Sequence, residues 1–247
     1  MFDFLGSESP TYLSSHALSQ VVAQVRFSTQ SLLSEPRGVA LLHDSLIEEY
    51  PRLLSEQQQT ITAGPGGLAA SAIPQWRMTD LNGGWSCVVG PEQLALETAA
   101  YTDWSEMRGR LTAALKALSD ITKIRVRERV GLRYVNHIDP GPDGSYSDRV
   151  SPDLLGLQAR PGWRDHVKTY LSQAVFEDNS VSLVVRSGAG ANVTNPEYKF
   201  MVDIDCYDEN PSAYDVESTM EHFDAFNDVA YRCFCACVTD DLRISMK

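Results

Sequence analysis

The chain has 247 residues, of which 43% are hydrophobic and 22% are charged, a balance typical of globular rather than disordered proteins. Acidic side chains outnumber basic ones by 33 to 21, and the net charge of −12 opposes broad, charge-driven binding to nucleic acid. No apolar run approaches the roughly 18 residues that a membrane-spanning helix needs. The acidic first residues and the odd number of cysteines predict a cytoplasmic protein without a signal peptide, with its thiols reduced.

Strand and helix patterns follow one another through the first half of the chain. In chain order we expect a loose lead-in, a strand, a helix, three meander strands and a second helix: residues 1–18, 21–27, 36–54, 76–81, 85–89, 93–101 and 104–119. Asn82-Gly83 predicts a tight hairpin, because both residues tolerate positive φ. Asp103 and Glu106 have the spacing of a capping box at the start of the second helix.

A run rich in proline and glycine, Asp139-Pro140-Gly141-Pro142-Asp143-Gly144, predicts a boundary between two halves, residues 19–139 and 140–247. The second half should contain short helices beginning at Ser151-Pro152, two strands and a final long helix: residues 151–172, 180–186, 197–207 and 216–242. We therefore expect an α+β fold, mainly antiparallel sheet with long helices packed on it. The first half has a ferredoxin-like order with one extra strand.

Residues 123–134 stand out because their hydrophobicity has a period of two, which predicts a long β-strand. One face would be cationic and the other apolar: Lys123, Arg125, Arg127, Arg129 and Arg133 against Ile124, Val126, Val130, Leu132 and Tyr134. The cationic face is a candidate anion site, since alternate guanidiniums are spaced comparably to the phosphates of a nucleic-acid strand. The competing interpretation is a structural face whose charges are neutralised by acidic neighbours.

A second strand, residues 198–207, supplies acidic neighbours of that kind. Its apolar residues alternate with Asp203 and Asp205, which share one face. Carboxylates and guanidiniums would meet across the sheet if the two strands lie close together. Asp203 and Asp205 also form a weak candidate Mg²⁺ site, because two carboxylates on one side of a strand suit that ion.

Other residues with potential chemistry favour structural roles. On the final helix Cys233 and Cys237 share a face and Cys235 points away, so the three thiols predict core packing and not a zinc site. The five histidines are scattered and form no catalytic pair, and the glycine-rich segment 187–195 lacks the ending of a phosphate-binding loop. We expect no catalytic set and no cofactor.

Three segments together resemble a sporadically distributed bacterial family of conserved hypothetical proteins of unknown function. They are residues 21–27, residues 129–136 with the sequence Arg-Val-Gly-Leu-Arg-Tyr-Val-Asn, and residues 223–246 at the end of the final helix. Membership would imply that the gene lies on mobile genetic elements, whose proteins commonly function in phage defence or toxin neutralisation. The resemblance also points to residues 129–136 as the place for a site, which adds Asn136 to the candidate anion-binding residues.

Two main functions remain open from the sequence. The favoured one is a non-enzymatic protein-binding or regulatory factor, because no catalytic set converges and an acidic surface suits a basic protein partner. The alternative is a phosphate-, nucleotide- or nucleic-acid-binding enzyme that grips phosphates with Arg125, Arg127, Arg129 and Arg133 and holds a metal with Asp203 and Asp205. A subunit of a homo-oligomer is a third possibility, and no membrane partner is expected.

Overall fold

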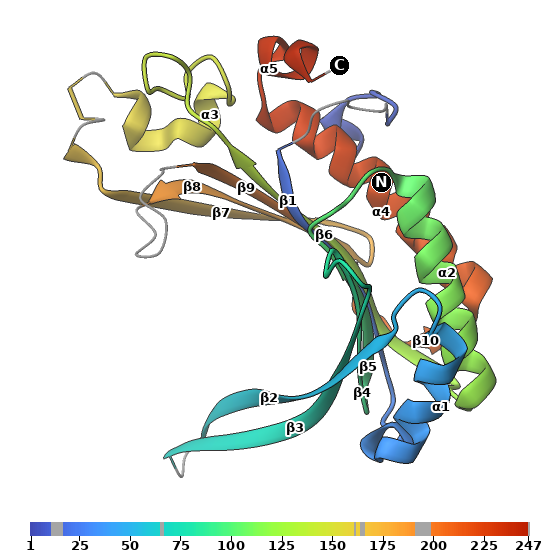
Figure 1. Cartoon of the computed structure of the whole chain (residues 1–247). Coiled ribbons are helices and arrows are strands. Elements are labelled where there is room, and N and C mark those ends of the chain that lie inside the picture. Colours follow the sequence, from blue (N-terminus) through green and yellow to red (C-terminus); the bar gives the residue numbers. More distant parts are fainter. Residues whose placement is uncertain (11–16, 65–66, 161, 164–165, 191–198, 247) are drawn as a thin grey trace. The chain divides into compact units, whose positions relative to one another are not determined.

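The computed structural model describes residues 1–10, 17–64, 67–160, 162–163, 166–190 and 199–246, and for residues 58–71 within these ranges only the backbone (Figure 1). Ten strands form one hydrogen-bonded sheet in the order β2-β3-β4-β5-β1-β6-β9-β8-β7, with β10 paired to β6. The strands are β1 (Leu18–Phe27), β2 (Arg52–Gly64), β3 (Gly67–Thr79), β4 (Trp85–Gly90), β5 (Gln93–Thr98), β6 (Val126–Ile138), β7 (Thr169–Asp178), β8 (Val181–Gly190), β9 (Phe200–Asp208) and β10 (Ser212–Ala213). The α-helices are α1 (Pro36–Leu46), α2 (Trp104–Ile121), α3 (Pro152–Leu155), α4 (Val216–Cys237) and α5 (Asp240–Ser245). The predicted α+β class with a mainly antiparallel sheet is confirmed.

The chain divides into two compact units, neither of which is continuous in sequence. Unit 1 comprises Met1–Val21, Gly131–Asp208 and His222–Lys247, and unit 2 comprises Val22–Val130 and Glu209–Glu221. Strands β1 and β6 and helix α4 each contribute residues to both units. The boundary predicted at residues 139–140 falls inside unit 1, because a turn that breaks secondary structure need not separate two cores.

In unit 2, helices α1 and α2 lie on one side of strands β4 and β5 (Figure 1). Alternate strand residues point to this side, and among them Trp76, Met78 and Cys87 are buried. The predicted buried stripe of α2 is confirmed, since Met107, Leu111, Leu115 and Leu118 have no exposed surface. The Asp103 side chain caps the helix by accepting a hydrogen bond from the Glu106 backbone N–H at 2.9 Å.

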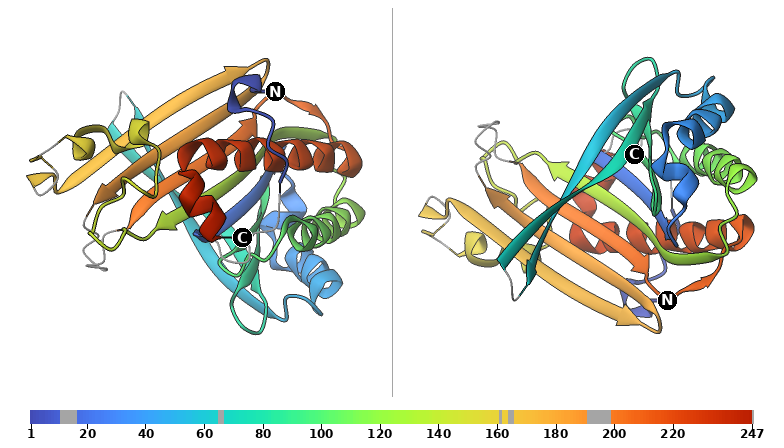
Figure 2. Two further views of the ribbon diagram at one scale, coloured as in Figure 1. Left: turned by 90° about the horizontal axis from the view of Figure 1, so that it is seen from above. Right: turned by 90° about the horizontal axis from the view of Figure 1, so that it is seen from below.

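The longest hairpin of unit 2 is a two-stranded ribbon made of β2 and β3, 13 residues each. Only Trp76–Thr79 of β3 pairs with β4, so the rest of the hairpin extends beyond the neighbouring strands (Figure 2). The helix predicted over residues 36–54 is too long, because α1 ends at Leu46 and β2 begins at Arg52. The predicted Asn82-Gly83 turn follows β3, and Gly83 adopts a φ of 73°.

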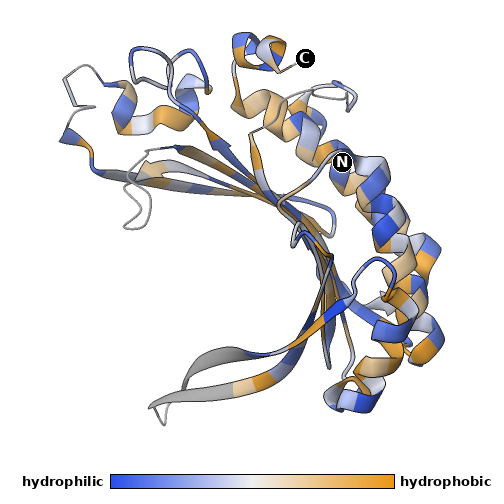
Figure 3. Cartoon of the chain, in the orientation of Figure 1, coloured by the Kyte–Doolittle hydropathy of each residue, from blue (hydrophilic) through white to orange (hydrophobic). Residues whose placement is uncertain are grey.

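Unit 1 contains the other end of the sheet and the greater part of α4. The Tyr134 hydroxyl on β6 donates to Asn227 Oδ1 on α4 at 2.7 Å, which identifies the face of β6 that the helix covers. Apolar and polar residues alternate along α4 (Figure 3), and the apolar ones include the fully buried Phe223 and Phe226. The helix predicted over residues 216–242 is two helices, because Thr239 caps α5 through the Leu242 N–H. Strand β7 occupies part of the segment predicted as helix up to residue 172.

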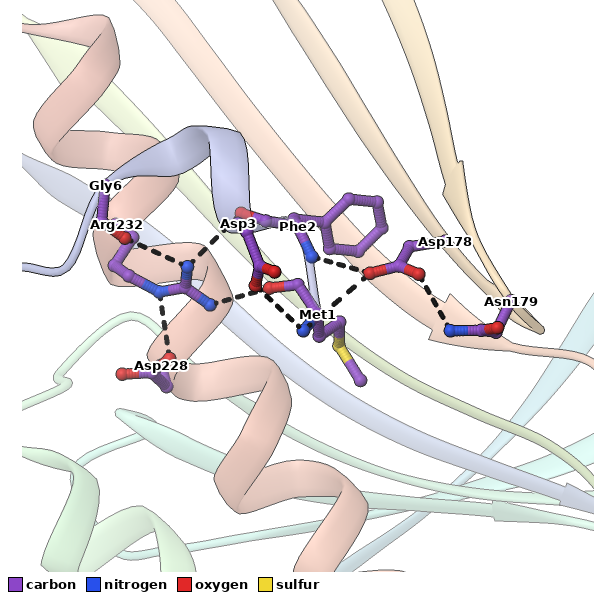
Figure 4. A network of polar contacts seen from close by, with 8 residues as sticks. All are labelled: Met1, Phe2, Asp3, Gly6, Asp178, Asn179, Asp228 and Arg232. Carbon is purple, nitrogen blue, oxygen red and sulfur yellow. Dashed lines mark hydrogen bonds and ion pairs between the residues drawn. The ribbon is translucent and has the colours of Figure 1, made fainter.

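The first ten residues, predicted as part of a loose lead-in, make specific contacts within unit 1. Phe2 is 2% exposed, and its N–H donates to Asp178 Oδ2 at 2.7 Å. The Arg232 guanidinium on α4 donates to the carbonyl oxygens of Met1, Phe2 and Gly6 (Figure 4). These carbonyls bind a fixed cation, which explains how a segment with only a short 3₁₀ turn, Asp3–Leu5, is held in place.

No helix in the described part of the chain combines the length and apolarity needed to span a membrane.

Candidate functional site

The candidate residues of the basic strand differ in exposure, so they do not form one uniform cationic face. Arg125 is exposed and Arg127 is only 3% exposed. Val126, predicted on the apolar face, is 38% exposed, at the end of β6 where β10 pairs with the strand. The expected alternation holds from Val130 onward, where Leu132, Tyr134 and Asn136 are buried on the helix-covered face. The Asn136 amide bonds within the sheet, since its Nδ2 donates to the Val202 carbonyl at 3.1 Å.

In unit 1 the basic and acidic strands meet as the ion-pairing interpretation predicts. Arg133 Nε and Nη2 donate to Asp203 Oδ1 and Oδ2 at 2.7 and 2.8 Å. Arg186 on β8 donates to the same Asp203 Oδ2 at 3.1 Å, while its Nε donates to Gln173 on β7. We call these four residues, Arg133, Asp203, Arg186 and Gln173, the Asp203 cluster. Hydrogen bonding to Asp203 raises the Arg133 pKa, so this guanidinium stays charged.

Asp203 is the centre of the cluster and is only 1% exposed, whereas the Arg133 and Arg186 side chains are 45% and 35% exposed. A buried carboxylate needs such compensation, because removing a charge from water is costly. Both of its oxygens accept hydrogen bonds from guanidiniums, an arrangement that opposes the alternative use of Asp203 as a metal ligand. Within the described residues no group of three or more His, Cys, Asp or Glu side chains is placed to hold a metal ion.

The basic strand continues in unit 2 with Arg129, which contacts an amide and an exposed acid rather than a buried acid. Arg129 Nη1 donates to Gln24 Oε1 on β1 at 2.9 Å, and its Nε lies 3.4 Å from Glu209. Gln24 Nε2 in turn donates to Gln93 Oε1 on β5 at 2.9 Å. Gln93 Nε2 donates to Gln75 Oε1 on β3 at 3.4 Å. We call this chain of hydrogen bonds, Arg129, Gln24, Gln93 and Gln75, the glutamine row.

A glycine explains how the glutamine row crosses β4. Gly90 pairs with Gln93, and the pairing of Val89 with Trp76 places Gln75 on the other side of Gly90. With no side chain on Gly90, the amides of Gln93 and Gln75 meet directly over the intervening strand. A larger residue at this position would stand between them, because cross-strand neighbours on one face lie about 5 Å apart.

The glutamine row borders a shallow groove of about 270 Å³ on the face of the unit 2 sheet opposite its helices. Its lining consists of four glutamines, two glutamates and three small apolar residues: Gln24, Gln57, Gln75, Gln93, Glu56, Glu97, Val22, Val88 and Ala95. Arg77 holds the two acids in place by donating to Glu56 at 2.8 Å and to Glu97 at 2.7 Å. Burial alone would lower the Arg77 pKa, but the hydrogen bonds to these glutamates outweigh it and raise the pKa.

The five cysteines, and the histidines other than His16, which lies outside the described residues, belong to neither the Asp203 cluster nor the glutamine row. All five cysteines are reduced and buried, which confirms the core-packing prediction for Cys233, Cys235 and Cys237. Burial raises the Cys87 pKa to about 12, so this thiol is unreactive at neutral pH. Burial, together with the charge of Lys199, lowers the pKa of His137.

The sequence predicted that guanidiniums of the basic strand could meet Asp203 and Asp205, without selecting the Arg133–Asp203 pair. It missed Arg186 and the whole glutamine row. The available signal was a polar residue flanked by buried apolar ones, as Gln24 is by Ala23 and Val25. That pattern places a glutamine on the polar face of one strand. It does not show which residues of other strands stand beside it.

No protein-family model matches this chain, and no curated protein is significantly similar to it. The resemblance to a sporadically distributed bacterial family therefore stays a prediction.

Proposed function

We propose that the chain is a non-enzymatic protein-binding factor and that the groove beside the glutamine row holds a segment of its partner. The observation that carries the proposal is the composition of the groove, in which amides and carboxylates surround a small apolar floor. Amide side chains both donate and accept hydrogen bonds, so they suit the backbone and polar side chains of a peptide. Phage defence or toxin neutralisation is the biological setting that the family resemblance implies, and the composition of the chain favours the cytoplasm.

The charge of the groove favours a basic segment. Glu56 and Glu97 carry two negative charges and Arg77 carries one positive charge, which leaves an excess of one negative charge. The side chains of these three residues are between 26% and 37% exposed, so a ligand can reach them without unfolding the sheet. A lysine or arginine of the partner would add charge-assisted hydrogen bonds to the carboxylates. The net charge of −12 would also speed the approach of a basic protein.

The test is binding of arrayed short synthetic peptides of graded charge to the purified protein, followed by titration of the best binder. We expect basic peptides to bind and their affinity to fall as salt is added. Gln75→Ala should weaken binding by about tenfold, the loss expected for one or two hydrogen bonds. Gln173→Ala in unit 1 is the matched control and should leave the affinity unchanged.

Peptides that bind equally well to wild type and to a Gln75→Ala, Gln93→Ala variant would exclude the groove as the binding site. Preference for acidic peptides would contradict the proposed charge recognition.

A second candidate function, anion binding, is favoured by the Asp203 cluster. Two guanidiniums share one carboxylate there, so the four residues of the cluster carry one positive charge, which the nearby Asp205 partly offsets, and both arginines are partly exposed. Phosphate or a nucleotide could accept hydrogen bonds from donors that Asp203 does not use. A thermal-shift titration with phosphate, nucleotides and short oligonucleotides tests this candidate, because a bound anion raises the melting temperature. Stabilisation of wild type but not of Arg186→Ala would move this function ahead of protein binding.

A further inference from the structure

The ribbon formed by β2 and β3 has an unusual charge distribution for this chain. Residues 57–76, between Glu56 and Arg77, contain no Asp, Glu, Lys or Arg, although 22% of all residues are charged. They cover the outer part of the ribbon, since β2 spans Arg52–Gly64 and β3 spans Gly67–Thr79. The protein therefore presents an uncharged two-stranded segment on an otherwise strongly acidic molecule.

In the part of the chain that the structure describes, no strand pairs with the outer backbone edge of β2. Among the described strands β2 is the last in the sheet order and pairs only with β3. An edge strand presents a row of N–H and C=O groups that another strand can bind, and proteins usually protect such edges with charges or proline. From Gln57 to Gly64, β2 has neither.

The opposite edge of the ribbon is protected. Pro74 lies in β3 opposite Gln57, just beyond the four residues that pair with β4. Proline has no N–H to donate, so it is confined to strand positions that do not add a further strand on that side. The two edges of one ribbon therefore differ: β3 is blocked at Pro74, and β2 is open.

We propose that the open edge of β2 pairs with β2 of a second copy of this chain, forming a four-stranded antiparallel ribbon. The uncharged segment is what selects a second copy as the occupant. Two molecules of net charge −12 repel each other over most orientations, and the repulsion is weak where the facing surfaces carry no charge. Antiparallel pairing of a strand with its own copy is two-fold symmetric, so the contact closes as a dimer.

The first test is the mass in solution of the full chain, measured by sedimentation and light scattering over a range of concentrations. One chain has a mass of 27.4 kDa, and the measured mass of wild type should approach twice this value as the concentration rises. A Thr60→Lys, Thr62→Lys variant places like charges on both copies of the strand and should weaken dimerisation at least about tenfold. A Ser45→Lys, Thr112→Lys variant, with the same added charge on α1 and α2, should dimerise like wild type.

A second test uses disulfide crosslinking, so it remains valid even if the lysine variants do not fold. Single cysteines replace successive β2 residues, from Gln57→Cys to Ala63→Cys, and each variant is oxidised mildly. The native cysteines are all buried and do not compete. Intermolecular disulfides should form most rapidly at one position, the residue on the two-fold axis, and less readily on either side of it. A wild-type monomer at all concentrations, open-ended assembly, or uniform crosslinking along β2 would overturn the proposal.

Discussion

The Asp203 cluster of unit 1 and the glutamine row of unit 2 both join side chains of neighbouring strands, but they use different chemistry. The Asp203 cluster surrounds a buried carboxylate with two guanidiniums. The glutamine row links half-buried neutral amides to a single arginine. A buried charge is costly to leave without partners, whereas a half-buried neutral amide loses less free energy when a partner is removed. The comparison indicates that the first arrangement stabilises the sheet and the second remains available for binding.

The largest expected effect comes from removing the central charge of the Asp203 cluster. Asp203→Ala leaves Arg133 and Arg186 close together without the shared carboxylate, and should lower the free energy of unfolding by about 3 kcal/mol. The melting temperature should fall by roughly 6–10 °C. Asp240→Ala, which removes an exposed carboxylate paired with Arg243, is the control and should cost less than about 1 kcal/mol. Equal losses for the two variants would show that Asp203 does not have the stabilising role assigned to it.

Double-mutant cycles would measure the difference between the two clusters directly. We expect a coupling energy of about 2 kcal/mol between Arg133 and Asp203, since two charge-assisted hydrogen bonds join them. Between Gln24 and Gln93, joined by one neutral hydrogen bond, it should be about 0.5 kcal/mol. Chemical denaturation of wild type, single and double variants gives both values. A larger coupling between the glutamines would reverse the comparison and assign the structural role to unit 2.

The smallest expected effect is the contribution of His137, in unit 1, to the pH dependence of stability. Burial and the charge of Lys199 lower the pKa of His137, so the folded protein holds this ring neutral where the unfolded chain has bound a proton. Stability should therefore fall as the pH drops through the unfolded value of about 6.5, and His137→Gln should remove that part of the dependence. Titration of the ring by NMR should give a pKa below 6.5, which Lys199→Met moves upward. A pKa above 6.5 in wild type would contradict this environment.

The central elements of the fold could be predicted from the sequence, and the two outermost strands could not. Strand β1 and helix α2 each bury one regular apolar face, so periodicity reveals them. Strand β4 is buried on both faces, and the Asn82-Gly83 turn before it is what reveals it. Strand β7 buries no such face, since Leu171 and Val175 are 68% and 53% exposed. Strand β2 was missed because glutamines and small residues occupy most of it. An edge strand is held mainly by backbone hydrogen bonds, which do not require a regular pattern of hydrophobic residues in the sequence.

The candidate site could also be predicted only in part. Alternating charges in β6 and β9 were sufficient to predict that their basic and acidic faces could meet, and the structure identifies Arg133 and Asp203 as the pair. The glutamine row depends on the order and register of β3, β5 and β1, and on a glycine in β4 that separates two of its members. Strand order and register are determined when the strands pair, so the sequence of a single strand does not reveal them.

All hydrogen bonds of the glutamine row run in one donor-to-acceptor direction, and Arg129 determines it. A guanidinium can only donate, so the Gln24 atom facing it must be the oxygen, and the nitrogen of Gln24 must face Gln93. The same constraint passes to Gln75, whose NH₂ group is left at the far end, beside the groove. An arginine three side chains away thereby determines that this end of the row offers hydrogens and not lone pairs. Exchanging Arg129 for glutamate would reverse every amide and, without altering one residue of the groove, change which ligands it accepts.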